Sequence, residues 1–241
     1  MEWSAPRGGH ITTERASEPK FTTGLSLFDG LFGPFLPGSI YLLVGRTGLT
    51  FSLIDRLVVS SAQRGMSTYY MDGGYRADPF AMARVLRMQR ADPRRALEKV
   101  MIARAFTAYQ MDTLVTEGLK QVQPPPDLLI VSSLDSLLSD PEVGLDEARG
   151  MAKNCMEALR EAASGGTCVV MAVMGGPRES ELFPVLTQHC TGWASFKNRP
   201  GNRVRVVTRG GAWTDIAPMH PFQTMLEEFS APYEPYATEV V

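Results

Sequence analysis

Short apolar runs alternate along the chain with segments whose apolar residues recur at helical spacing. After the first run, Leu53, Leu57 and Ala62 fall on one helical face, and Gly65 marks the end of that helix. Buried strands that alternate with helices predict an α/β fold, with a mostly parallel sheet covered by helices on both faces. The runs that predict buried strands are residues 39–44, 68–71, 128–131 and 168–173.

Turn signals divide the rest of the chain into shorter elements. Asp78-Pro79 and Asp92-Pro93 each combine a capping carboxylate with a first-turn proline, so each predicts the start of a helix. Alternation around Pro200-Gly201-Asn202 predicts a C-terminal β-hairpin over residues 193–208. A further strand is predicted at 100–103, and further helices at 109–122 and 145–163.

The composition is that of one ordinary globular domain. The chain has 241 residues, of which 44% are hydrophobic and 21% charged, and its net charge of −2 neither requires nor forbids nucleic-acid binding. Residues 1–20 are polar and predict a flexible N-terminal arm. Residues 21–229 are expected to form the core domain, and the acidic residues 230–241 a disordered tail.

Membrane and metal functions are not favoured. No run approaches the roughly 18 apolar residues of a membrane span, and the opening residues lack an apolar signal-peptide core, so we expect a cytoplasmic protein. Cys155, Cys168 and Cys190 lie far apart, without the spacing of metal ligands, so no metal site is expected. Cys155 and Cys168 fall within a predicted helix and strand and are expected in the core.

The first apolar run leads into a degenerate phosphate-binding pattern. The working pattern is G-x-x-x-x-G-K-[ST], in which backbone amides and a lysine hold phosphate groups. Here the sequence GRTGLTFS keeps Gly45 and Ser52, but Thr50 replaces the second glycine and Phe51 replaces the lysine. Threonine restricts the backbone, and phenylalanine removes a charge-assisted hydrogen bond of about 1.5–3 kcal/mol. The residues of this vestigial phosphate loop are Gly45, Gly48, Thr50 and Ser52.

Two stretches on either side of this loop suggest a family. Upstream, FTTGLSLFDGLFG begins at Phe21 and is followed by Gly38-Ser39-Ile40; downstream, Asp92-Pro93 precedes VMIARAF, which ends at Phe106, and then Gln110-Met111. In residue types and spacing both stretches resemble the ATPase core of the archaeal RadA recombinases. The resemblance covers about residues 20–210 and implies a RecA-like P-loop core.

The resemblance assigns four catalytic positions, and each lacks its side chain. Phe51 stands for the phosphate-binding lysine, and Ser132 for the aspartate that holds magnesium. Gly73 lies in the turn that would contain the water-activating glutamate, and Met174 follows the strand that would end in the γ-phosphate-sensing N-Q pair. Phosphoryl transfer depends on positioning and charge neutralisation, so we expect an inactive ATPase.

Two nearby carboxylates are not expected to replace the missing groups. Asp135 lies three residues past Ser132 and is predicted in the next loop. Asp72 matches a position that precedes the family's glutamate. No cofactor is therefore expected, although Ser52 and the helix N-terminus leave residual ATP binding open.

The predicted hairpin offers a nucleic-acid site. Two of its arginines, Arg203 and Arg205, are two residues apart and share one strand face. A basic row of this kind can contact a phosphate backbone, but it also suits a solvated edge hairpin on which charge prevents aggregation. The candidate DNA-binding residues are Lys197, Arg199, Arg203, Arg205 and Arg209.

The resemblance also implies a protein-binding site. RadA-type recombinases polymerise by inserting the phenylalanine and alanine of an F-x-x-A linker into a neighbour's pocket, part of which is the A-R-A strand. The chain keeps Ala103, Ala105 and Phe106 of that strand but has no F-x-x-A in residues 1–20. These residues are candidates for binding a partner, or they are retained simply as core.

The sequence thus predicts a non-catalytic RadA paralogue, an accessory or regulatory factor in recombinational repair. Its expected partners are a RadA-type recombinase or other repair proteins and, weakly, DNA. Two alternatives stay open: a KaiC-like switch that binds ATP without hydrolysing it, and an ATPase with an unorthodox phosphate site. The oligomeric state is not determined by the sequence.

Overall fold

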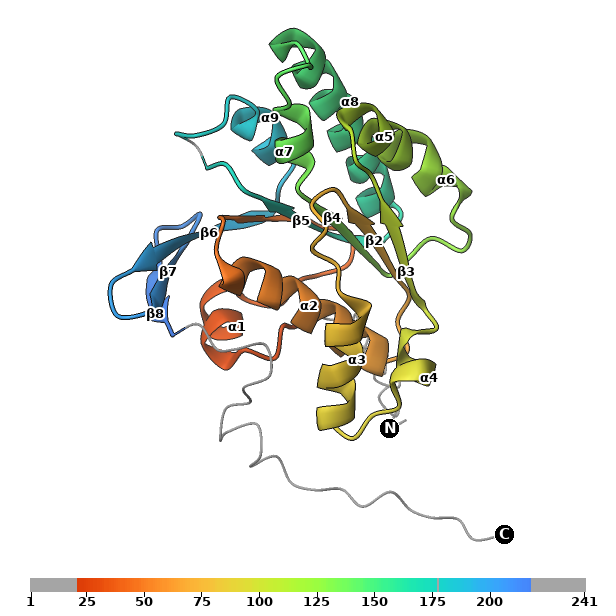
Figure 1. Ribbon diagram of the computed structural model, residues 1–241, viewed down its shortest axis with the longest axis vertical. Helices are drawn as coiled ribbons and strands as arrows, with labels where there is room; N and C mark the ends of the chain where they lie inside the picture. Colours follow the sequence, from red (N-terminus) through yellow and green to blue (C-terminus); the bar gives the residue numbers. More distant parts are fainter. Residues whose placement is uncertain (1–20, 177, 218–241) are drawn as a thin grey trace, which may run out of the picture.

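The strands form a single mixed sheet in the structure, a computed structural model that describes residues 21–176 and 178–217. The strand order is β3-β2-β4-β5-β1-β6-β7-β8 (Figure 1). Strands β1 to β6 run parallel to one another, whereas β7 and β8 are antiparallel additions that form a meander with β6 at one edge. The strands are β1 (Ile40–Val44), β2 (Thr68–Asp72), β3 (Val100–Arg104), β4 (Leu128–Ser132), β5 (Cys168–Val173), β6 (Gly192–Arg199), β7 (Arg203–Thr208) and β8 (Trp213–Ile216).

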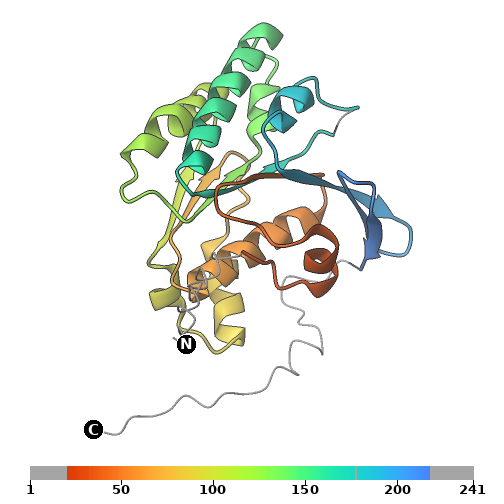
Figure 2. The ribbon, with the colours of Figure 1, turned by 180° about the vertical axis from the view of Figure 1, so that it is seen from behind.

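Helices cover both faces of this sheet, as the two opposite views show (Figures 1 and 2). One layer contains α1 (Ser26–Phe32), α2 (Gly48–Gln63), α3 (Pro79–Met88) and α4 (Pro93–Leu97). The other contains α5 (Ala108–Thr113), the π-helix η1 (Leu114–Gly118), α6 (Leu119–Gln121), α7 (Leu134–Leu138), α8 (Leu145–Ser164) and α9 (Phe183–Thr187).

The central strands are apolar throughout because they are buried on both faces. In β1, Leu42 and Val44 pack into the core beneath α8, whereas Tyr41 and Leu43 pack into the core beneath α2. Successive residues of a strand point to opposite faces, so a strand between two helical layers needs apolar residues at every position.

Local signals place several helices where the sequence predicts them. Asp78 and Asp92 each cap a helix that opens with a proline, and their carboxylates accept backbone N–H bonds of 2.9–3.1 Å. Cys155 and Cys168 are buried, as predicted. None of the helices among the described residues has the length and apolar character needed to cross a bilayer.

The α/β class, the mostly parallel sheet and the C-terminal hairpin are confirmed. The prediction was incomplete at β8, which pairs with β7 and turns the hairpin into a three-stranded meander. The helix predicted at 109–122 is confirmed as an unbroken helical segment over residues 108–121, in which η1 is a π-helical turn between α5 and α6. The predicted arm (1–20), the tail (230–241) and the end of the predicted core (218–229) lie outside the described residues.

Candidate functional site

The vestigial phosphate loop is a short turn in which polar groups bond to one another. Helix α2 begins at Gly48, only three residues after Gly45, so Thr50 to Ser52 already lie within the helix. Thr47 caps this helix: its Oγ1 accepts the Thr50 N–H at 3.2 Å and lies 2.9 Å from the Thr50 hydroxyl. An amide that an open loop would offer to phosphate is therefore already bonded.

Packing alone explains why the first glycine of the loop is present. Gly45 has φ of 149°, and a Cβ atom there would lie 2.5 Å from the carbonyl oxygen of Phe196 in β6. No larger residue fits between β1 and β6 at this point. Gly45 is thus required by the neighbouring strand, whether or not phosphate binds.

Phe51, at the position where the sequence predicted a lost lysine, has a half-buried ring. The ring packs against the core on the α2 side of the sheet. The guanidinium of Arg76 lies over the ring, 4.5 Å from its centroid. This contact is a cation–π interaction, which holds the arginine against the ring.

Asp72 lies buried at the end of β2 and has its hydrogen-bonding capacity filled. Its two oxygens accept backbone N–H groups of Gly74, Arg76 and Ala77 at 3.0–3.1 Å. Burial by itself would raise the pKa of Asp72, but these bonds outweigh it and lower the pKa below its usual value. A carboxylate held in this way supports the turn after β2 and is unsuited to act as a base.

Ser132 and Gly73, two of the four degenerate positions, belong to the same closed turn. The Ser132 hydroxyl donates to Asp72 at 3.0 Å. A Cβ atom on Gly73 would lie 2.7 Å from Leu137, 2.8 Å from Met111 and 3.0 Å from the Ser132 carbonyl oxygen. A glutamate at this position would require its neighbours to move.

Asp135 is buried in α7, so its prediction as a loop residue was wrong. Its Oδ2 accepts the N–H groups of Met174 and Gly175 at 2.8 and 2.7 Å, and thus fixes the chain at the end of β5. Burial raises the pKa of Asp135 despite these bonds. The described residues contain no cluster of three or more His, Cys, Asp or Glu side chains suited to a metal ion.

Asp55 is a partly buried titratable residue that the sequence did not point to, and its Oδ1 atom is inaccessible to solvent. It lies in the second turn of α2, and its Oδ1 has no hydrogen-bond partner among the described residues. Burial, together with the carboxylates of Asp78 and Asp72, raises the pKa of Asp55 to about 7. The available signal was an aspartate directly after Leu53 and Ile54, on a helix with a broad apolar face.

Four of the five basic candidates share one outer face of the meander. Lys197 pairs with Arg205, and Arg199 with Arg203, so all four side chains point away from the core. Arg205 is bonded to Asp215 through Nε (2.8 Å) and Nη2 (2.7 Å). It also lies over the Trp213 ring, 4.0 Å from the centroid.

Arg209, the fifth candidate, lies apart from this face. Its Nη1 donates to the carbonyl oxygen of Cys190 at 3.1 Å, so it supports the start of β6. Asp215 and Trp213 were missed because β8 was not predicted. The freest cations of the meander are thus Lys197, Arg199 and Arg203.

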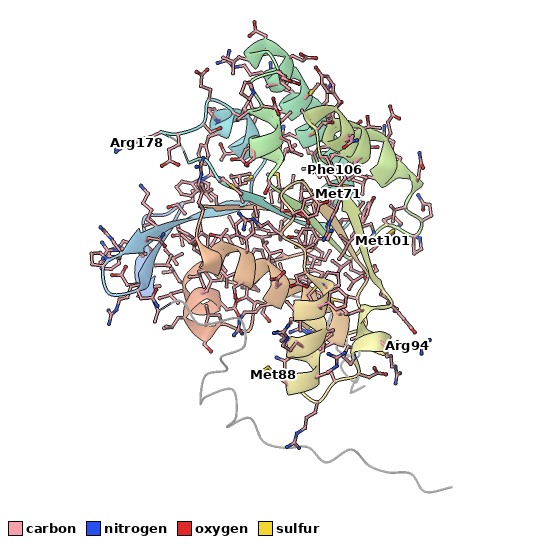
Figure 3. The ribbon with its side chains drawn as sticks, in the orientation of Figure 1. Met71, Met88, Arg94, Met101, Phe106 and Arg178 are labelled. Atoms are coloured by element: carbon pink, nitrogen blue, oxygen red, sulfur yellow. The ribbon has the colours of Figure 1, made fainter. Side chains whose placement is uncertain are left out.

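The partner-binding candidates lie at the opposite edge of the sheet. Ala105 is buried and its N–H bonds to the Asp72 carbonyl oxygen, whereas Ala103 is only half-buried. Phe106 is 56% exposed and contacts Tyr75 in a tilted arrangement, with 5.4 Å between the ring centroids. Met101, on the same edge strand, is 49% exposed (Figure 3). Met101 and Tyr75 extend the surface predicted from Ala103, Ala105 and Phe106.

The chain was compared with models of protein families and with curated proteins, and neither comparison gives a match.

Proposed function

We propose that the chain is a non-catalytic relative of the RadA-type recombinases that acts as an accessory protein in DNA recombination. It binds a protein partner along the outer edge of β3 and binds nucleic acid weakly through the meander. The observation that supports this best is a contrast: the polar groups of the former ATP site bond internally, while the β3 edge exposes apolar side chains.

The closed site argues against hydrolysis. Phosphoryl transfer needs charge at the phosphates, a metal and an oriented water. Phe51 offers no charge, Ser132 is bonded to Asp72, and Gly73 has little room for a larger residue. The same internal bonds disfavour both alternatives, the ATP-binding switch and the unorthodox ATPase. An ATP titration tests the first, and a steady-state assay tests the second.

The edge of β3 suits an extended peptide. Within residues 21–176 and 178–217, β3 pairs with β2 alone, so its other side is a strand edge. Met101 and Ala103 share one face of that edge, and Phe106 with Tyr75 extends the apolar surface beyond it. A partner strand would gain main-chain bonds and an aromatic contact, which is the mode of β-strand addition.

The test is binding of a labelled F-x-x-A peptide, and of a RadA-type recombinase, to the full chain. Met101→Glu should weaken both complexes at least tenfold, because it places a charge in the apolar contact. Met88→Glu is a matched control: Met88 is 48% exposed but lies on α3 (Figure 3). Ala105→Glu is unsuitable because Ala105 is buried and the variant would lose its fold.

Phe106→Ser and Phe80→Ser form a second pair, since Phe80 is exposed on α3. Circular dichroism checks that each variant is folded. Equal losses at Met101 and Met88 would contradict the proposed edge. Absence of binding by both peptide and recombinase would overturn the proposed partner.

A further inference from the structure

The outer face of the meander combines cations with an exposed aromatic ring. The register places Lys197, Arg199 and Arg203 on this face, with Trp213 on the adjacent β8. The Trp213 side chain is 56% exposed. The opposite face of the same strands is buried through Phe196, Val204, Val206 and Ile216. The cations and the tryptophan are therefore presented together to solvent.

Arg205 differs from the other cations of this face because it is bonded to neighbouring side chains. Its Nε and Nη2 donate hydrogen bonds to Asp215, and its guanidinium lies over the Trp213 ring. The hydrogen bonds from Arg205 lower the pKa of Asp215, so this carboxylate stays charged and keeps the arginine in place. Arg205 thus orients Trp213, while the remaining cations stay available for phosphates.

We infer that this face binds single-stranded nucleic acid, with Trp213 stacking on an unpaired base and Lys197, Arg199 and Arg203 contacting the backbone. A base in a duplex is already stacked on its neighbours, whereas an unpaired base is free to stack on an aromatic side chain. The inference rests on the weak nucleic-acid binding included in the proposed function, and it does not depend on the β3 edge.

The test measures binding of the full chain to three labelled probes at low salt by fluorescence anisotropy: oligo-dT, oligo-rU and a DNA duplex. Trp213→Ala should weaken oligo-dT binding about tenfold and leave duplex binding within about twofold, since one stacking contact is lost. Phe80→Ala is the matched control, because Phe80 is 81% exposed on α3, outside both proposed binding surfaces. It should change neither.

A second pair of variants tests the cations. Arg199→Glu with Arg203→Glu should abolish binding of all probes and reduce its salt dependence. Arg94→Glu with Arg95→Glu, on α4, should change binding by less than twofold (Figure 3). The oligo-rU probe distinguishes RNA from DNA as the ligand. Equal affinity for oligo-rU and oligo-dT would indicate a site that recognises only base stacking and phosphate groups.

Two outcomes would overturn the inference and are distinguishable. If Trp213→Ala weakens single-strand and duplex binding equally, or weakens neither, the stacking role fails while the proposed nucleic-acid binding stands. If the wild-type chain binds no probe, both the stacking role of Trp213 and the proposed nucleic-acid binding are wrong. The partner proposal is judged separately, by the peptide and recombinase.

Discussion

Charged side chains gather in two regions of the molecule, the carboxyl ends of the parallel strands and the outer meander, and the two regions use them differently. In the first, Asp72 and Asp135 are buried and bonded to backbone amides. In the second, Lys197, Arg199 and Arg203 are exposed to solvent. A buried carboxylate that supports a turn stabilises the fold. An exposed cation contributes little to stability, so it can contact a ligand without loss of fold stability. Changes in the first region should therefore alter stability, and changes in the second should alter binding.

The largest expected effect is at Asp72. Asp72→Ala should lower the free energy of unfolding by about 3 kcal/mol or more, because three backbone amides and the Ser132 hydroxyl lose their acceptor. Urea unfolding measures this loss. Asp146→Ala, at a fully exposed carboxylate of α8, should stay within about 0.5 kcal/mol of wild type. Similar losses at both positions would mean that the buried bonds of Asp72 add no more stability than an exposed carboxylate does.

Replacing Asp55 should stabilise the fold, unlike replacing Asp72, and the gain should depend strongly on pH. Its pKa is about 7 in the folded chain against 3.8 as the reference, so the folded state binds more protons between these values. Stability should therefore fall as pH rises from about 4 to 7. Asp55→Asn should raise the free energy of unfolding by at least about 2 kcal/mol at pH 8, with little change at pH 4. Asp146→Asn should show no such difference between the two pH values.

Phe51→Lys tests whether the first region can support ATP hydrolysis. ATP turnover should stay at background with or without DNA, because Ser132 still provides no carboxylate for magnesium. Stability should fall by about 1 kcal/mol as a half-buried ring is lost. A steady-state ATPase assay and urea unfolding measure the two effects. Turnover that appears in this variant, or wild-type turnover that falls on Ser52→Ala, would show that the loop is a working site in another frame.

The smallest expected effect is at Arg199, which faces Arg203 across the meander. Arg199→Glu should raise stability by about 0.2–1 kcal/mol, because a pair of like charges becomes a pair of opposite charges. Adding Arg203→Glu should return stability to the wild-type value, since the pair is again of like charge. Thermal unfolding at low salt measures this cycle. A loss in the single variant would mean that Arg199 supports the fold.

The sequence alone determined the layout of the chain. The apolar runs gave the central strands, because a strand buried on both faces needs apolar residues at every position. The proline and aspartate pairs gave the starts of α3 and α4, because these signals act within one turn of helix. The sequence also indicated the turn between β1 and α2, since Gly45 to Gly48 separate an apolar run from residues at helical spacing.

Tertiary structure decided which polar residues are free to act. Ser132 and Asp72 are 60 residues apart in the chain, and only their neighbouring strands bring them into one hydrogen bond. Asp215 removes Arg205 from the free cations only because β8 pairs with β7. Burial of Ala105 and exposure of Met101 likewise depend on the position of β3 at the sheet edge. Pairing between distant segments sets these contacts, and local patterns do not encode it.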